Sequence, residues 1–206
     1  MQVHPYYFSP HKRAFDLLLA VLLVVALGPL LVLIALLVLI TAGSPLIFRQ
    51  KRLGKDGRVF ITYKFRTMVR NATMLKPKYV KLNEAPAPMF KIKKDPRFVG
   101  AGWPLSRTGL DELPQLWNIV RGEMSFVGPR PLPVSEARAL PADWRAWREQ
   151  VRPGIFSQWA LSQEKHLSLT KWRQLEKTTL TQGSLKTDLQ QIFLTVKLIF
   201  MSLFNR

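Results

Sequence analysis

The sequence predicts a mainly helical protein with one small β-hairpin, joined to a membrane through its N-terminal segment. Three observations support this fold class. They are an uncharged apolar run over residues 17–40, an Asp-Gly turn between two β-rich stretches, and helical apolar spacing further along the chain. A chain of 206 residues has room for one domain and an anchor. We expect residues 1–45 to form the membrane part and residues 46–206 a compact domain.

The charge of the chain indicates an anionic partner. It has 31 lysines and arginines against 13 acidic residues, a formal net charge of +18. Nucleic acid, acidic lipid headgroups and phosphorylated substrates all fit such a charge. The absence of cysteine excludes disulfides, thiolate metal sites and a cysteine nucleophile. Because the three histidines are scattered as well, we expect any nucleophile to be an oxygen.

The apolar run of about 24 residues is longer than the roughly 18 that indicate a membrane helix. No small-residue cleavage site follows it, so it should stay in the protein. Gly28 and Pro29 break it in the middle, because proline removes an N–H group and clashes with the preceding turn. Each half then reaches about 17 Å, against about 30 Å of hydrocarbon. A kinked spanning helix and a hairpin that returns to the same face both remain open, and the basic flanks slightly favour the hairpin.

The stretch that follows predicts a β-hairpin with its turn at Gly54-Lys55-Asp56-Gly57. We interpret the basic residues of its turn region as contacts for anionic headgroups. Lys64 and Arg66, at the end of the second strand, are better placed to bind a phosphate.

Three later segments complete the predicted fold. Residues 74–88 contain three prolines and predict a loop or a short broken helix. Residues 141–151 predict a helix with Trp144, Trp147 and Val151 in the core. Residues 188–204 predict a helix with one apolar stripe that packs on the core, lies in the membrane interface, or does both. The stripe comprises Leu189, Ile192, Phe193, Val196, Ile199, Phe200 and Leu203.

A helix beginning after Thr108 carries the candidate chemistry. Thr108 resembles a capping residue for Asp111, and Pro114 fits a first helical turn. Asp111 and Glu112 therefore fall at the helix N-terminus. The buried apolar face should contain Leu113, Leu116, Trp117 and Val120, and an opposite polar stripe should contain Asp111, Gln115 and Asn118.

Acidic residues at a helix N-terminus are often there only because the helix dipole stabilises them, by about 0.3 to 1 kcal/mol. The free N–H groups of that terminus and Arg130, fixed between Pro129 and Pro131, favour a phosphate site instead. A carboxylate beside a phosphate needs a neutralising cation, and Mg²⁺ is the natural one. Asp111 could then attack phosphorus as a nucleophile.

The chain resembles the monotopic phosphoglycosyl transferases, also called bacterial sugar transferases. Each matching motif alone is weak, but their joint order along the chain is specific. The motifs are His11–Asp16, Phe48–Gly54, Tyr63–Met68, Asp95–Arg97, Leu110–Gln115, Gly128–Pro131 and Asp188–Thr195.

This resemblance implies a re-entrant helix-break-helix hairpin bent at Gly28-Pro29, a catalytic domain with interfacial amphipathic helices, and a place on the cytoplasmic face of the bacterial inner membrane. It implies that Asp111 takes the sugar phosphate of a UDP-sugar, releases UMP and passes the phosphosugar to a polyprenyl phosphate such as undecaprenyl phosphate. Such a reaction is the first membrane step in building a glycoconjugate or exopolysaccharide.

The resemblance also implies a Mg²⁺ ion held by Asp111 and Glu112. We expect the substrate and phosphate contacts to come from Lys64, Arg66, Arg107, Gln115, Pro129, Arg130 and Pro131. The other expected partners are anionic membrane lipids.

Two positions depart from the family pattern. Ser106 stands where a basic residue is usual, so Arg107 has to compensate, and Phe156-Ser157 replaces a Thr-Gly pair. An alternative is therefore a weakly active or inactive membrane scaffold of a polysaccharide-assembly complex. A nucleic-acid binder rests on the charge alone, and no nucleic-acid motif accompanies it. We therefore expect no nucleic-acid partner.

Overall fold

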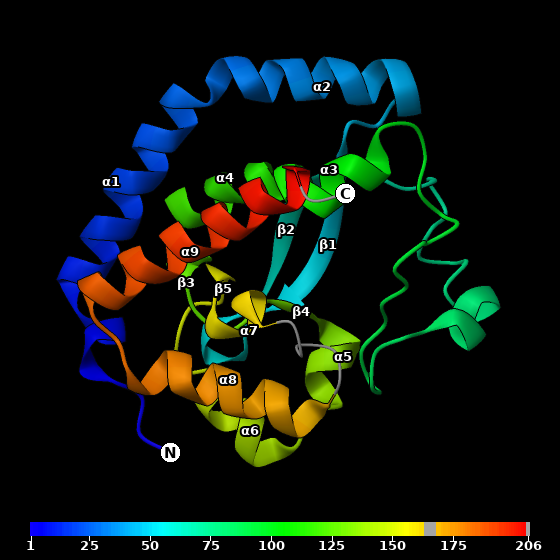
Figure 1. The fold of residues 1–206 in the computed structure, drawn as a ribbon. Coiled ribbons are helices and arrows are strands. Elements are labelled where there is room, and N and C mark those ends of the chain that lie inside the picture. Colours follow the sequence, from blue (N-terminus) through cyan, green and yellow to red (C-terminus); the bar gives the residue numbers. More distant parts are fainter. Residues whose placement is uncertain (163–167, 205–206) are drawn as a thin grey trace.

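The computed structural model describes residues 1–162 and 168–204, and the side chains up to residue 201. Figure 1 shows the arrangement of the helices and strands. Their bounds are α1 Pro10–Ala26, α2 Gly28–Ala42, β1 Ile47–Leu53, β2 Val59–Phe65, α3 Gly102–Thr108, α4 Leu116–Val120, β3 Ser125–Val127, β4 Leu132–Pro133, α5 Val134–Arg138, α6 Ala142–Arg148, β5 Gly154–Phe156, α7 Gln158–Leu161, α8 Leu169–Thr181 and α9 Leu185–Phe204, with 3₁₀ turns at Pro5–Phe8, Lys55–Gly57, Pro77–Leu82 and Leu110–Gln115.

Helices α1 and α2 are the two halves of the apolar run, and the predicted break between them is confirmed. α1 ends at Ala26, α2 begins at Gly28, and the two axes are bent by 63°. Pro29 lies in the first turn of α2, where its missing N–H is not needed. Among the described helices none is long and apolar enough to cross a membrane alone, while this bent pair meets that test by length and composition.

The β-hairpin is confirmed, and a third strand extends its sheet. β1 pairs antiparallel with β2 from Ile47 opposite Phe65 to Leu53 opposite Val59. Asp56 and Gly57 both take positive φ, at 56° and 68°, which the Asp-Gly turn allows. β4 adds to the other edge of β1, and β3 and β5 form a separate short parallel pair. Residues 74–88, predicted to be a loop or a short broken helix, contain a 3₁₀ turn at Pro77–Leu82.

The core lies in three apolar clusters. One joins α6, α7 and α8, where Trp144, Trp147 and Val151 are buried as predicted. A second joins α1, α4 and β3, with Ile119 and Phe126 at its centre. The third packs the end of α2 against β2 and α3. The turn Leu110–Gln115, which follows α3, packs against β2 of the sheet and leads into α4, which lies against α1.

Helix α9 presents its polar face to the protein and its apolar face outward. Asp188, Gln191 and Thr195 are buried, whereas Phe193 is 65% and Phe200 61% exposed. Most of the predicted apolar stripe therefore does not pack on the core. The exposed apolar side chains of α9 are Leu189, Phe193, Leu194, Val196, Leu198, Phe200 and Met201. The side chain of Leu203, the last member of the predicted stripe, lies outside the described part.

A buried ion cluster joins α9 to α1. The Lys12 Nζ lies 2.8 Å from Asp16 Oδ1 and 2.6 Å from Asp188 Oδ2, and all three side chains are at most 4% exposed. The Tyr6 hydroxyl donates to the same oxygen of Asp188 at 3.0 Å. Burial raises the pKa of Asp188, and the charge of Lys12 opposes that rise. One cation thus holds two buried carboxylates from opposite ends of the chain.

Replacing Lys12 by methionine should destabilise the fold strongly. Two buried carboxylates would lose their shared cation, and breaking a buried pair in this way costs about 3–5 kcal/mol. Unfolding by urea in a detergent micelle measures the change. Arg173→Met is the matched control, because it breaks an ion pair whose side chains are 42% and 66% exposed. Equal stability of the two variants would contradict a structural role for Lys12.

Candidate active site

The two candidate carboxylates lie at the start of a 3₁₀ turn. Helix α3 ends at Thr108, Gly109 with a φ of 71° turns the chain, and the turn Leu110–Gln115 then leads into α4. Asp111 and Glu112 are in its first turn, as predicted. The predicted capping role of Thr108 is wrong. Its hydroxyl donates to Pro104 O and Leu105 O, within α3.

The face of this segment that meets the sheet carries the polar stripe. Asp111, Gln115 and Asn118 are all at most 5% exposed. The Asn118 amide donates to Ile61 O at 2.7 Å and accepts from the Tyr63 N–H at 3.3 Å, both on β2. These bonds hold the segment against the sheet and place Asp111 beside the end of β2.

The predicted burial of Trp117 is wrong, since it is 55% exposed, while Leu116 and Ile119 are buried. The 3₁₀ turn has three residues per turn instead of 3.6, so the spacing that predicts the buried face is shifted by the time the chain reaches α4. Because of that shift, Trp117 faces outward although the regular helical spacing predicts that it faces the core.

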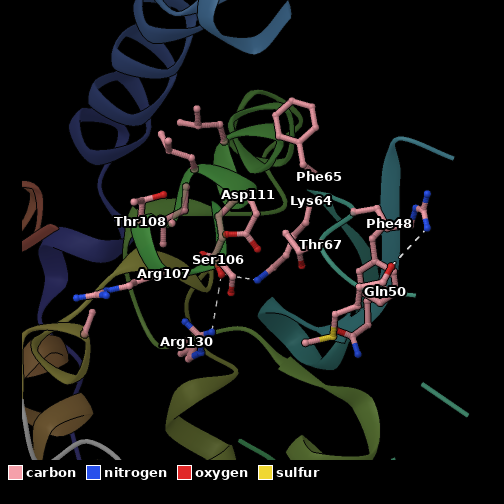
Figure 2. Close-up of a pocket in the computed structure, with 18 of the residues that line it drawn as sticks. Phe48, Gln50, Lys64, Phe65, Thr67, Ser106, Arg107, Thr108, Asp111 and Arg130 are labelled. Atoms are coloured by element: carbon pink, nitrogen blue, oxygen red, sulfur yellow. Dashed lines mark hydrogen bonds and ion pairs between the residues drawn. The ribbon is translucent and has the colours of Figure 1, made fainter. Parts of the chain in front are cut away.

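Glu112 is the centre of the charged contacts. Lys64 Nζ from β2 forms an ion pair with Glu112 Oε1, and the Arg130 guanidinium lies 3.8 Å from the same oxygen. Figure 2 shows Lys64 and Arg130 directed toward the side of the pocket that holds Asp111. Two predicted phosphate contacts are thus brought together with the two carboxylates.

The two carboxylates differ in their electrostatics. Burial raises the pKa of Asp111 to about 6, against the opposing charge of Lys64. Burial also acts to raise the pKa of Glu112, but Lys64 and Arg130 outweigh it and lower that pKa to about 2. Glu112 therefore carries a firmly held negative charge, whereas Asp111 is buried beside it with less cationic support.

The other predicted contacts are divided between the pocket and the scaffold. Arg66 is engaged elsewhere. Its side chain donates to Pro45 O at 2.7 Å and to Gly43 O at 2.6 Å, at the end of α2. The Arg107 guanidinium lies 5.3 Å from the ring centre of Trp103 and is directed away from Asp111 (Figure 2). Gln115 is buried, and its Oε1 has no hydrogen-bond partner in the described part. Pro129 and Pro131 flank Arg130 in its turn.

Lys91 is a candidate that the sequence analysis missed. It lines the same pocket, and its pKa is lowered by burial and by the charges of Arg130 and Lys64, while Asp111 and Glu112 oppose the shift. Its backbone is held by the Asn83 side chain, which accepts the Lys91 N–H at 2.7 Å. The aperiodic segment around it offers no spacing from which Lys91 could have been found. Ser106 lines the pocket where a basic residue was expected.

The carboxylate pair and its cations line a cavity of about 1760 Å³. The charged residues of its lining include Lys64, Asp111, Glu112 and Arg130. Apolar side chains of α1, α2 and α9, and of the break between α1 and α2, also line it. They include Leu23, Leu27, Leu30, Ile192, Val196 and Ile199. Such a cavity can hold a molecule with a phosphate at one end and a hydrocarbon chain at the other.

The donor set for a metal is small. Within the described residues, no three acidic or histidine side chains lie close enough together to hold a metal ion. Asp111 and Glu112 supply two adjacent carboxylates. This suits Mg²⁺, which takes one or two carboxylates and completes its shell with substrate phosphates and water.

Several known proteins have sequences similar to this chain. The family model described as bacterial sugar transferase matches residues 7–202. The exopolysaccharide production protein ExoY of Sinorhizobium fredii is 35% identical over 93% of this chain and 86% of its own. The UDP-galactose-lipid carrier transferase of Erwinia amylovora is 34% identical over 91% of this chain. The UDP-glucose:undecaprenyl-phosphate glucose-1-phosphate transferase of Escherichia coli is 35% identical over 90% of it.

The chain spans most of the length of ExoY, but only 40% and 39% of the two named transferases. The match to the family model begins at Tyr7 and ends near the end of α9. It includes the carboxylate pair, Lys64 and Arg130. The chain belongs to the bacterial sugar transferase family.

Proposed function

We propose that this protein transfers a sugar 1-phosphate from a UDP-sugar to a polyprenyl phosphate such as undecaprenyl phosphate, and releases UMP. The observation that carries the proposal is the Asp111-Glu112 pair, with Asp111 buried and Glu112 paired with Lys64 and close to Arg130, in the lining of the cavity. Relatives named for a UDP-sugar and for undecaprenyl phosphate support the donor and the acceptor. They are named for galactose and for glucose, so the sugar is left open.

In this proposal Asp111 is the nucleophile. Its carboxylate oxygen attacks the phosphorus that bears the sugar, the bond from that phosphorus to the UMP oxygen breaks, and UMP leaves with the electron pair. A phosphate oxygen of the acceptor then attacks the same phosphorus and releases the Asp111 carboxylate. Lys64 and Arg130 offset the negative charge that gathers between carboxylate and phosphates. Glu112 holds both cations in place.

Asp111 and Glu112 would hold Mg²⁺ together with the donor phosphates. When bound, the ion polarises the phosphoryl oxygens and reduces the repulsion between phosphate and carboxylate. The residues of the chain itself do the positioning. The 3₁₀ turn fixes the two carboxylates side by side, and β2 supplies Lys64 from the other wall.

We further propose that α1 and α2 form a re-entrant hairpin on the cytoplasmic face of the bacterial inner membrane. From residue 17 to residue 40 the exposed side chains of both helices are apolar, including Leu18 at 72% and Ile40 at 82% exposed. The outward apolar face of α9 fits the same lipid surface. The apolar walls of the cavity would then admit the hydrocarbon chain of the acceptor toward Asp111. The basic residues of the β-hairpin favour contact with anionic lipids.

The test of the transferase function is release of UMP from a panel of UDP-sugars in the presence of undecaprenyl phosphate. We expect one or more donors to react. Asp111→Asn should lower the rate by about 10³-fold or more, because the amide cannot act as the nucleophile. Asp143→Asn, an exposed site on α6, is the matched control and should react normally. If no donor releases UMP, the inactive scaffold becomes the better interpretation.

Removal of divalent metal should stop the same reaction. Dialysis against EDTA is expected to abolish UMP release, and added Mg²⁺ should restore it, because two carboxylates and a diphosphate cannot approach without a shared cation. Full activity in EDTA would refute the metal site at Asp111 and Glu112. Glu112→Gln should raise the Mg²⁺ concentration that gives half the maximal rate.

The hairpin can be tested by cysteine labelling, since the chain has no cysteine of its own. Single cysteines at Gln2 and Ser44, both exposed, lie before α1 and after α2. In sealed membrane vesicles both should react with a membrane-impermeant maleimide from the cytoplasmic side. Labelling from opposite sides would mean that the bent pair crosses the membrane.

A further inference from the structure

The turn that carries Arg130 is short of hydrogen-bond donors. Pro129 and Pro131 have no N–H group, so only Gly128 and Arg130 can donate, while every residue of the turn has a carbonyl that can accept. A turn enclosed by protein needs outside donors for the surplus carbonyls. The structure supplies them from several other segments.

Strand β5 satisfies the first half of the turn. The Gly128 N–H donates to Phe156 O at 3.1 Å, and the Gly154 N–H donates to Pro129 O at 2.9 Å. The Phe156 side chain stacks on Phe126 of β3. Phe156 is one of the departures from the family pattern, and here its backbone helps to fix the turn.

Three charged side chains satisfy the second half. The Arg130 N–H donates to Glu176 Oε1 at 3.2 Å. Arg148 Nη2 donates to Arg130 O at 2.6 Å, and Arg52 Nη1 donates to Pro131 O. These side chains come from α8, α6 and β1, three elements far apart in the sequence. We call Arg52, Arg148 and Glu176 the backbone clamp.

The side chains of the backbone clamp are almost fully buried, and two of them pair with each other. Glu176 is 0% and Arg52 9% exposed. Glu176 Oε2 pairs with Arg148 Nη1 and also accepts from the indole N–H of Trp144 at 3.1 Å. Arg52 Nη2 donates to Gln50 Oε1 at 2.7 Å. Each contact leaves the clamp residue little freedom to move away from the turn.

Stability alone does not explain this arrangement. Taking a charge out of water costs several kcal/mol, and apolar residues of similar volume are often at least as stabilising as a buried ion pair. What the clamp does provide is a fixed position for one backbone segment. The side chain on that segment is Arg130, which is partly exposed to the cavity and lies 3.8 Å from Glu112 Oε1. Its guanidinium carbon also lies 4.9 Å from the ring centre of Trp159.

We propose that Arg52, Arg148 and Glu176 are positioning residues that act on the transfer reaction through Arg130. They hold its backbone on both sides, so that the guanidinium stays beside Glu112 and faces the donor phosphates. The inference rests on the proposed transferase function for its kinetic consequence, but the holding of the turn is a property of the protein without substrate.

The first experiment measures amide hydrogen exchange of the full-length protein without substrate, by mass spectrometry of the peptide that covers residues 128–133. Arg148→Met and Glu176→Gln should speed exchange at the Arg130 amide, because the clamp loses its ion pair. Arg152→Met is the matched control. Arg152 Nε donates to a different carbonyl, Gly122 O, at 2.8 Å, and its loss should leave this peptide unchanged. Unchanged exchange in both clamp variants would overturn the proposal.

The second experiment is a double-mutant cycle on kcat/KM for the UDP-sugar. Arg148→Met should lower it by about 10- to 100-fold in the native protein, as small displacements of a positioned group do. In an Arg130→Ala background the same change should alter kcat/KM less than about 2-fold, since the side chain being positioned is already gone. Glu176→Gln, which keeps the shape of the side chain, should repeat the pattern.

The outcomes are distinct. If the clamp variants lower kcat/KM equally with and without the Arg130 side chain, the clamp only supports the fold and the proposal is overturned. Faster hydrogen exchange at the Arg130 amide, together with a loss of kcat/KM that vanishes in the Arg130→Ala background, would support the proposal. If the native protein releases no UMP, the transferase function fails and with it the kinetic part, while hydrogen exchange still decides whether the clamp holds the turn.

Discussion

Lys12 is the point on which the arrangement of this protein depends. Its ammonium group joins Asp16 of α1 to Asp188 of α9, and Asp16 also accepts the Phe126 N–H of β3 at 3.1 Å. Strand β3 continues directly into the Gly128–Pro131 turn. The contact that holds the hairpin helix to the domain is therefore only a few residues away, along one strand, from the arginine that faces the carboxylate pair. The N-terminal helices and the carboxylate pair are parts of one connected framework.

Cations shared between carboxylates are also the main feature of the candidate active site. Lys64 and Arg130 both serve Glu112 and leave Asp111, one residue earlier, buried with weaker support. Burial raises the pKa of Asp111, whereas Lys64 and Arg130 outweigh burial at Glu112 and lower its pKa. One carboxylate is thereby suited to hold cations and the other to react. Two neighbours in the sequence thus differ in their electrostatics because Lys64 of β2 pairs with only one of them.

Local patterns predicted the local structure well. The Asp-Gly turn predicted the β-hairpin, Gly28-Pro29 the helix break, and the acidic pair the start of a helical turn, because each depends on a few adjacent residues. The parallel pair β3–β5 could not be predicted, since each strand has three residues and the two are far apart in the sequence. The predicted burial of Trp117 was wrong because a 3₁₀ turn shifts the helical spacing. The hydrogen bonds of Arg66 and the place of Lys91 in the cavity depend on tertiary contacts, which no sequence pattern predicts. The stripe of α9 was visible, but a stripe alone does not tell which face meets the protein.

The two partners of Lys12 become available at very different times during synthesis. Asp16 lies four residues further along the same helix and can pair as soon as α1 forms. Asp188 lies 176 residues away and leaves the ribosome long after Asp16 does. Helix α1 can thus form with its lysine already paired locally, and α9 completes the cluster afterwards. Docking of α9 follows the formation of α1, and until it occurs the cavity lacks part of its lining.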